Sequence, residues 1–287
     1  MFFTIKTIAF FVLDAIINTA KTAVWISLLG SAILLGGAPL VIYVLSDIHG
    51  NLRRFKSIMS QIKLSPNDTL YVLGDIVDRF PDGIKILKIL MQMPNVKMLI
   101  GNHELMMLDC LDENYDFNNE SDFYEYHDNL RVWYANGGRV THNSIKHTKK
   151  ETRKEIFTFL RSLPLSYDVE LNGKKYKLCH AAPPELFERS GYRYANKTYF
   201  SVWKRWESFE LISNEYITIY GHTPTYKYNP SSPLKIWYGD NRIDIDCGAG
   251  YDGNVGVETR LACLRLDDMK EFYSEEPKIE EKEKEYY

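Results

Sequence analysis

Three apolar stretches in the first half of the chain each run directly into a group of polar residues. The stretches cover residues 41–45, 70–73 and 96–100, and each predicts a buried strand. Between them, apolar residues recur at helical spacing over residues 52–62 and about 82–91, which predicts a helix in each interval. This alternation of strand and helix predicts a parallel sheet and indicates the α/β class.

The second half of the chain alternates less regularly. Residues 109–150 are rich in Asp, Asn, Glu and Tyr, and we expect them to form a small helical insertion, followed by a helix over 151–163. The Asn172-Gly173 pair predicts a hairpin turn, so this half should be richer in strands and partly antiparallel. The strands expected there cover residues 166–171, 175–178, 216–220, 242–246 and 261–266.

Both ends of the chain differ from the main domain, which we expect over residues 40–266. The tail, 267–287, becomes an alternation of acids and lysines from residue 271, which is typical of a solvated segment. Residues 1–39 are hydrophobic, and their last 18 residues carry no charge, at the short limit of the roughly 17–25 that span a bilayer. This leader is interpreted in three ways: as a membrane anchor, as a cleaved signal peptide, or as a mis-set translation start.

The overall charge and the cysteines narrow the class of protein. A formal net charge of −3 gives no basic surface for a nucleic-acid partner. The four cysteines are scattered and include no C-x-x-C pair, which argues against a thiolate metal site and a disulfide framework and indicates a reducing compartment. We therefore expect a cytoplasmic protein, with membrane attachment through residues 1–39 as the alternative. The oligomeric state is left open.

The polar residues that follow the predicted strands are the candidate chemistry. Asp47 and His49 follow the first strand, Asp75 the second and Asn102 the third. Asp47 and Asp75 are 28 residues apart, and Asp75 and Asn102 are 27 apart, close to the length of one strand–helix–strand unit. Because ligands bind at the carboxyl edge of open α/β sheets, we expect these side chains to share a site.

Two more histidines, His180 and His222, follow predicted strands in the second half. With the other four residues they offer oxygen and nitrogen ligands without sulfur, which suits Mn²⁺, Fe or Zn²⁺ better than Ca²⁺. Six ligands exceed what one catalytic metal with open positions uses, so they favour two metals that share a bridging carboxylate. The alternative is that Asp47, Asp75 and Asn102 are helix N-caps and that the histidines are ordinary buried residues.

Five short blocks occur in the order typical of the calcineurin-like metallophosphoesterases, and the chain resembles this family over about residues 40–266. The blocks are Asp47-Ile48-His49-Gly50-Asn51, Gly74-Asp75-Ile76-Val77-Asp78-Arg79, Gly101-Asn102-His103-Glu104, Cys179-His180-Ala181 and Gly221-His222-Thr223-Pro224. Within the family, the resemblance is to the bacterial branch of the phosphoprotein phosphatases. It implies a four-layer αββα sandwich with a central pair of mixed β-sheets and a small helical insertion.

The resemblance also implies a binuclear centre of two divalent metal ions, Mn²⁺ first, with Fe, Zn²⁺ or Ni²⁺ as alternatives. Asp75 would bridge the two ions, and a hydroxide between them would attack phosphorus. The metal ligands would be Asp47, His49, Asp75, Asn102, His180 and His222.

The remaining site residues are implied in the same way. His103 would be the general acid that protonates the leaving oxygen, and Asp78 would orient its imidazole. Asp246, in the block Ile245-Asp246-Cys247-Gly248, resembles the segment that closes the sheet behind the site. The residues that bind the substrate phosphate would be Arg79, Arg205, Asn102 and His103.

Some polar residues have simpler interpretations. Arg205 lies close to Trp203 and Trp206, so a cation–π contact on a surface helix is its alternative. Three histidines of the insertion are expected at the surface: His127, His142 and His147.

One position departs from the family pattern. Phe80 follows the Asp78-Arg79 pair where the family usually has Gly, which allows a backbone φ above zero. We expect this change to affect Arg79 and the substrate range more than the metal site.

These observations lead to three hypotheses on function. The first is a metal-dependent serine/threonine protein phosphatase that hydrolyses phosphomonoesters of phosphoproteins, and the pair Asp78-Arg79 together with Arg205 supports it. The second is a symmetrical bis(5'-nucleosyl)-tetraphosphatase or another nucleotide phosphohydrolase, although such relatives generally lack the Asp of the pair. The third, suggested by Phe80, is a phospho-binding module without catalysis.

Overall fold

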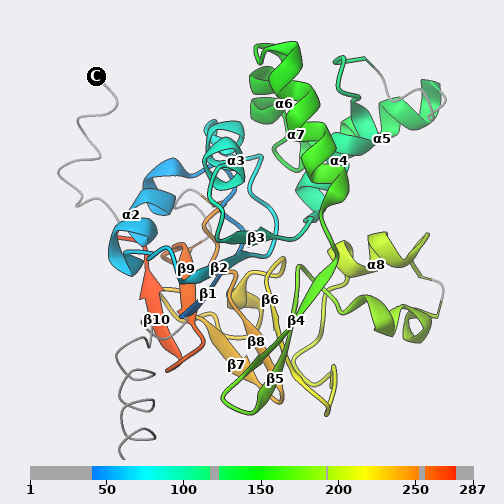
Figure 1. Ribbon diagram of the computed structural model, residues 1–287. Coiled ribbons are helices and arrows are strands. Elements are labelled where there is room, and N and C mark those ends of the chain that lie inside the picture. Colours follow the sequence, from blue (N-terminus) through cyan, green and yellow to red (C-terminus); the bar gives the residue numbers. More distant parts are fainter. Residues whose placement is uncertain (1–40, 117–122, 192, 252–255, 276–287) are drawn as a thin grey trace, which may run out of the picture. The chain divides into compact units, whose positions relative to one another are not determined.

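Two five-stranded β-sheets lie face to face in the structure, a computed structural model that describes residues 41–116, 123–191, 193–251 and 256–275 (Figure 1). The first sheet has the order β10-β9-β1-β2-β3, and the second has the order β4-β5-β6-β8-β7. The strands of the first sheet are β1 (Ile42–Leu45), β2 (Thr69–Val72), β3 (Val96–Met98), β9 (Ala262–Arg265) and β10 (Lys270–Tyr273). Those of the second are β4 (Ser166–Leu171), β5 (Lys174–Cys179), β6 (Ile217–Tyr220), β7 (Trp237–Gly239) and β8 (Arg242–Asp244).

The first three strands are parallel, as their spacing predicts, whereas β9 and β10 are antiparallel to their neighbours. Both faces of this sheet are buried. Tyr43 and Leu45 of β1 pack against helices, while Ile42 and Val44 pack against the second sheet. This double burial explains why β1 is apolar throughout rather than alternating.

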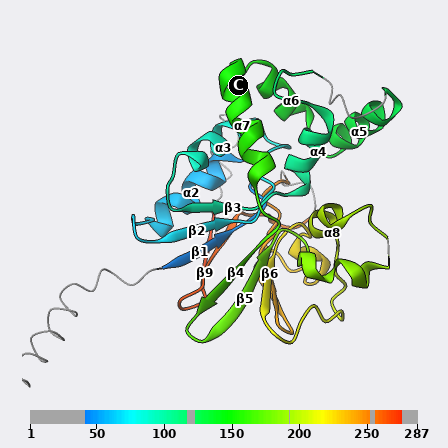
Figure 2. The ribbon, with the colours of Figure 1, turned by 45° about the vertical axis from the view of Figure 1, so that its right-hand side comes forward.

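Helices cover the outer face of each sheet (Figures 1 and 2). Those that follow the first three strands, together with the insertion, are α2 (Leu52–Ile62), α3 (Gly83–Met91), α4 (Asn102–Cys110), α5 (Phe123–Ala135), α6 (Arg139–Lys146) and α7 (Lys150–Ser162). The shorter layer on the second sheet is built from η1 (Pro184–Ser190), α8 (Lys197–Trp203) and η2 (Thr225–Lys227). The predicted four-layer α/β sandwich with a helical insertion is thus confirmed.

The sequence missed two edge strands. Lys270–Tyr273 pairs antiparallel with β9, so the expectation of a solvated segment from residue 271 was wrong at its start. Phe272 is buried and its ring lies 6.1 Å from that of Tyr43, a contact that the surrounding charges conceal in the sequence. The other missed strand is β7, which pairs with β8.

In the part of the chain that the structure describes, every helix is too short or too polar to traverse a bilayer. The leader, 1–39, lies outside the described residues.

Candidate active site

The loops that follow β1 and β2 run side by side at the carboxyl edge of the first sheet. The Asp47 N–H donates to the Gly74 carbonyl at 3.2 Å, and the His49 N–H donates to the Asp75 carbonyl at 2.9 Å. These bonds extend the pairing of the two strands and bring the first two motifs into register. The α4 helix begins at the third strand end, with Asn102 and His103 in its first turn.

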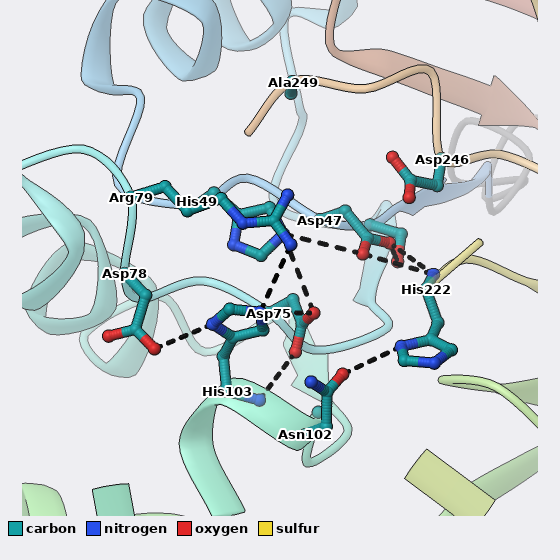
Figure 3. A network of polar contacts seen from close by, with 12 residues as sticks. Asp47, His49, Asp75, Asp78, Arg79, Asn102, His103, His222, Asp246 and Ala249 are labelled. Carbon is teal, nitrogen blue, oxygen red and sulfur yellow. Dashed lines mark hydrogen bonds and ion pairs between the residues drawn. The ribbon is translucent and has the colours of Figure 1, made fainter. Parts of the chain in front are cut away.

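The backbone at this edge is strained. Six polar residues adopt the left-handed region, with φ between 49° and 71°: Asp47, His49, Asp75, Asp78, Arg79 and His222. Each such residue costs of order 1–3 kcal/mol, and such residues cluster at functional sites. With this backbone conformation the side chains converge, as Figure 3 shows for several of them.

The Asp75 carboxylate lies at the centre of this cluster (Figure 3). Its Oδ1 accepts the backbone N–H of His103 at 3.0 Å. The Nε2 atoms of three imidazoles surround the same carboxylate: that of His180 is 3.5 Å from Oδ1, and those of His49 and His103 are 3.7 and 3.8 Å from Oδ2. One carboxylate therefore faces imidazoles from both sheets.

Asn102 and His222 form the second half of the cluster. The Asn102 Oδ1 lies 3.0 Å from His180 Nε2 and 2.8 Å from His222 Nδ1. The backbone N–H of His222 donates to both oxygens of Asp47, at 3.2 and 3.0 Å. His222 Nε2 is buried and has no hydrogen-bond partner within the described residues.

Two imidazoles are oriented by backbone carbonyls. His49 Nδ1 lies 3.2 Å from the Val77 carbonyl, and His180 Nδ1 lies 2.8 Å from the Leu73 carbonyl. Since a carbonyl only accepts, each Nδ1 must carry the hydrogen, which leaves each Nε2 with a free lone pair facing Asp75. Metal-binding histidines are commonly oriented in this way.

The electrostatics of the cluster fit divalent cations. Burial raises the pKa of Asp47 to about 6, with the Asp75 charge adding to the shift, and burial raises the pKa of Asp75 to about 7. Burial also lowers the pKa of His49, His180 and His222, which keeps these imidazoles in the neutral, ligating form. Two groups of residues could each hold a metal ion: His49, Asp75 and His103, and Asp75, His180 and His222. A cation would stabilise the ionised carboxylates.

His103 faces the cluster with one edge and Asp78 with the other. Its Nδ1 lies 2.7 Å from Asp78 Oδ2, and its Nε2 lies 3.4 Å from Arg79 Nη2. Burial raises the pKa of Asp78 to about 7 and lowers that of His103 to about 4, so the pair holds one proton between these values. A proton donor and a guanidinium thus stand beside the candidate metal ligands.

Arg205 is exposed and follows α8. Burial lowers the pKa of His222 and His103, and the positive charge of Arg205 adds a smaller effect in the same direction. The cation over the Trp206 ring is that of Lys204, at 4.6 Å. The cation–π contact with Trp206 is thus made by Lys204, and the phosphate-binding role of Arg205 stays a prediction.

Phe80 does not take the left-handed conformation that a Gly would allow. Its N–H donates to the His49 carbonyl at 3.1 Å, while Asp78 and Arg79 carry the positive φ angles. Phe80 is thus compatible with the backbone at this position. Its side chain is partly exposed, so any effect on the substrate range lies with the ring.

Glu104 is a site residue that had no role in the prediction from the sequence. Its buried carboxylate accepts four backbone N–H groups at 2.8 to 3.2 Å, from Asp75, Ile76, Val77 and Gly101. These bonds fix the loop after β2 against the start of α4. The motif contains a clue to this role, because Glu104 directly follows His103 at the end of a buried strand. A carboxylate buried there needs several hydrogen-bond donors.

A second unpredicted contact holds Arg79. Its guanidinium carbon lies 4.8 Å from the centre of the Tyr251 ring. Gly250 is required beside it, since a Cβ there would lie 2.4 Å from the His49 ring and 2.7 Å from Arg79 Nη1. Arg54 of α2 holds this loop by donating to the carbonyls of Ala249 and Tyr251.

Asp246 lies close to Asp47 in Figure 3. Its carboxylate accepts the Gly248 N–H, and burial together with the Asp47 charge raises its pKa to about 7.

The three histidines of the insertion differ in their exposure to solvent. His127 and His147 are exposed, as predicted. The expectation for His142 was wrong, because its ring stacks on Trp133 with centroids 5.5 Å apart and its Nδ1 lies 2.5 Å from the Tyr134 hydroxyl.

Similarity to known proteins extends over the same residues. The sequence profile of the calcineurin-like phosphoesterases matches residues 40–246. A serine/threonine-protein phosphatase 2 of Salmonella typhimurium is 30% identical over 145 residues, 50% of this chain and 59% of that protein. A symmetrical bis(5'-nucleosyl)-tetraphosphatase of Pectobacterium atrosepticum is 37% identical over 68 residues, 23% of this chain and 24% of that protein. The chain thus matches less than two thirds of either relative.

A solved structure supports the fold. The crystal structure of a candidate diadenosine tetraphosphatase superposes with a TM-score of 0.50 at 14% identity, covering 83% of this chain and 95% of the other. The profile match includes all six candidate metal ligands and the pair Asp78-His103. The chain belongs to the calcineurin-like phosphoesterase family.

Proposed function

We propose that the chain is a metal-dependent phosphomonoesterase that removes phosphate from phosphoserine or phosphothreonine in proteins. The observation that carries the proposal is the position of His103, hydrogen-bonded to Asp78 at 2.7 Å and 3.4 Å from Arg79, on the edge of the candidate metal ligands. An alkyl phosphate such as phosphoserine needs both a phosphate clamp and a proton for its leaving oxygen. This arrangement offers both.

The proposed metal ligands are Asp47, His49, Asp75, Asn102, His180 and His222, with Mn²⁺ as the first candidate. Two divalent cations held there would acidify a water for attack on phosphorus and offset charge on the phosphoryl group. Arg79 would grip two phosphoryl oxygens with its planar fork, and Arg205 would add a second positive charge. Asn102 and His103 would lie against the same phosphate.

His103 would then supply the proton. The one proton of the pair can reside on either residue. With that proton on His103 and Asp78 ionised, the imidazolium would donate from Nδ1 to Asp78 and from Nε2 to the leaving oxygen, in place of the contact with Arg79. General acid catalysis of this kind contributes typically 10²–10⁴-fold. The presence of this donor argues against a phospho-binding module without catalysis, which has no use for it.

A symmetrical dinucleoside tetraphosphatase is the second candidate. The 37% identity over 68 residues to the relative of that name favours it, whereas the longer match is to the serine/threonine phosphatase. Both candidates use the same metal ligands. They differ in the leaving group, which is a serine or threonine alcohol in one case and a nucleotide phosphate in the other.

A substrate panel tests the proposal. Full-length protein loaded with Mn²⁺, Ni²⁺ or Zn²⁺ is given phosphoserine and phosphothreonine peptides, dinucleoside tetraphosphates and p-nitrophenyl phosphate. We expect the highest kcat/KM on a phosphopeptide. Efficient cleavage of the dinucleotides with none of the peptides would overturn the proposal in favour of the second candidate. The His103→Asn variant should lose on the order of 10²-fold or more in turnover while retaining its metal.

A further inference from the structure

The Asp78-Arg79 pair is enclosed by the helical insertion, although its own motif lies in the first sheet. Three contacts reach it from the segment that contains the end of α5, the following turn and α6. The Trp133 Nε1–H donates to Asp78 Oδ2 at 2.9 Å, the Asp78 N–H donates to Thr141 Oγ1 at 2.9 Å, and the Arg79 N–H donates to the Gly137 carbonyl at 3.1 Å. Asp78 and Arg79, which both have positive φ, are thus held by a segment more than fifty positions away.

Trp133 is held in this position on several sides. Its side chain is fully buried, and the His142 ring stacks on it at 5.5 Å. Gly138 leaves room for the indole, because a Cβ at that position would lie 2.3 Å from Trp133 Nε1. The neighbouring Gly137 has φ of +95° and lies against Arg79. The Gly137-Gly138 turn is therefore shaped around Trp133 on one side and Arg79 on the other.

The indole and the imidazole share one oxygen. Asp78 Oδ2 lies 2.9 Å from Trp133 Nε1 and 2.7 Å from His103 Nδ1. An indole N–H can only donate, and one carboxylate oxygen can accept two hydrogen bonds. Trp133 and His103 can therefore both donate to Asp78 Oδ2. Since His103 has few other polar contacts on that edge in the described structure, the carboxylate position sets the ring position.

We propose that Trp133, supported by Thr141, is a positioning residue for the general acid: it fixes Asp78 so that His103 presents Nε2 to the leaving oxygen. The inference rests on the proposed phosphoesterase function. In the hydrolytic step the P–O bond to the alcohol breaks, its electron pair stays on that oxygen, and the Nε2 proton moves to it. The oxygen of water forms the new bond to phosphorus and keeps one proton, and the other proton of water passes through solvent to restore His103. Trp133 touches none of the reacting atoms.

The leaving group separates this role from a merely structural one. A nitrophenolate leaves readily without a proton, whereas an alkoxide does not, so misplacement of the acid slows only esters of weakly acidic alcohols. A general loss of folding or metal would slow all esters alike. The dependence of kcat on the leaving group therefore reports on the position of His103.

The test compares Trp133→Phe with the wild type, both loaded with Mn²⁺, on p-nitrophenyl, phenyl and ethyl phosphate. We expect kcat to fall about 10–100-fold on ethyl phosphate and less than about 3-fold on p-nitrophenyl phosphate, with KM and metal content unchanged. Trp237→Phe is the matched control, since it makes the same change in β7, where the indole stacks on Tyr228 and does not contact Asp78. The control should keep the wild-type ratio between the esters.

Thr141→Val provides a second arm in case Trp133→Phe fails to fold. It removes the acceptor of the Asp78 N–H and should change the ratio in the same direction by a smaller factor, while Thr141→Ser should restore it. An equal loss on all three esters, or none, in a folded and metal-loaded variant would overturn the inference. Failure of the wild type on phosphopeptides would count against the protein substrate alone, because the ester series does not depend on it.

Discussion

The two sheets supply the site with different chemistry. The loops of the first sheet bring Asp47 and Asp75, whose pKa values burial raises to about 6 and 7. The strand ends of β5 and β6 in the second sheet bring His180 and His222, whose pKa values burial lowers. Among the proposed metal ligands, the first sheet therefore supplies both carboxylates, beside the neutral His49 and Asn102, whereas the second sheet supplies neutral imidazoles alone.

The two halves are also held differently. Glu104 fixes the loop after β2 through bonds within the first half of the chain. The histidines of the second sheet are fixed against the first sheet, His180 through the Leu73 carbonyl and His222 through the Asp47 carboxylate. Loss of a carboxylate should thus disturb both metals, whereas loss of one imidazole should leave much of the site intact.

The largest effect is expected from Asp75→Asn. Asparagine tolerates the φ of 53° at this position, so the backbone should be retained while the charge is lost. We expect both metals to bind weakly and turnover to fall on the order of 10³-fold or more. Metal analysis of the purified variant beside steady-state kinetics measures this. Asp240→Asn, an exposed carboxylate in the β7–β8 turn, is the control, and retention of two metals by Asp75→Asn would contradict a bridging role.

His222→Asn should have a smaller effect. The change removes a neutral ligand and leaves Asp47 and Asp75 in place, so one of the two metals should be retained. We expect turnover to fall by about 10²-fold and to recover in part at high Mn²⁺ concentration. Titration of metal content against activity distinguishes the outcomes. Loss of both metals together would show that the second sheet is as essential to the charge balance as the first.

The same contrast decides what the sequence could predict. The first three strands and α2 follow from apolar periodicity, and the near-equal spacing of Asp47, Asp75 and Asn102 places their side chains at one edge. His180 and His222 follow no such period, because their strands belong to a separate, mixed sheet. They entered the prediction because each follows a predicted strand, and the resemblance to a family then assigned them to the metal site.

Other contacts have no local signal at all. Trp133 and Asp78 are 55 positions apart, and only the packing of the insertion brings the indole to the carboxylate. Edge strand β10 was not predicted because charged residues lie close to Phe272 in the sequence. A single apolar residue among charges does not produce the alternation that indicates a strand. Sequence patterns thus located the carboxylates, whereas the residues that hold them required the fold.

Glu104→Gln tests how the first half is held. An amide can still accept at its oxygen, but its NH₂ group would face backbone N–H groups that the second carboxylate oxygen now accepts. We expect the free energy of unfolding to fall by about 2–4 kcal/mol and turnover to fall about 10–100-fold. Chemical denaturation and kinetics measure the two losses. Glu113→Gln, which breaks only a surface ion pair with Arg161, should leave stability nearly unchanged, and an equally small effect at Glu104 would contradict the role assigned to it.

The smallest effect concerns pH and tests the charge balance itself. In the metal-free protein, the raised pKa values of Asp75 and Asp246, both about 7, mean that the folded state binds more protons than the unfolded chain, whose carboxyl groups titrate near pH 4. Their contribution to stability is present at low pH and is lost as pH rises through about 7. The lowered pKa of the buried histidines acts in the opposite direction, but only below about pH 6.5, where histidines of the unfolded chain are protonated.

Metal binding requires ionised carboxylates and neutral imidazoles, so both groups make the cation bind more tightly as pH rises. We therefore expect the increase in Tm caused by Mn²⁺ to grow steadily from pH 5 to pH 8, by several degrees in total. Thermal unfolding with EDTA and with saturating Mn²⁺ across this range measures the difference. Asp75→Asn should flatten the dependence more than His222→Asn, since the carboxylate contributes its own titration near pH 7 and the imidazole does not. A gain in Tm that is constant with pH would show that the carboxylates of the first sheet are ionised without the cations, and the contrast between the two sheets would then be one of geometry alone.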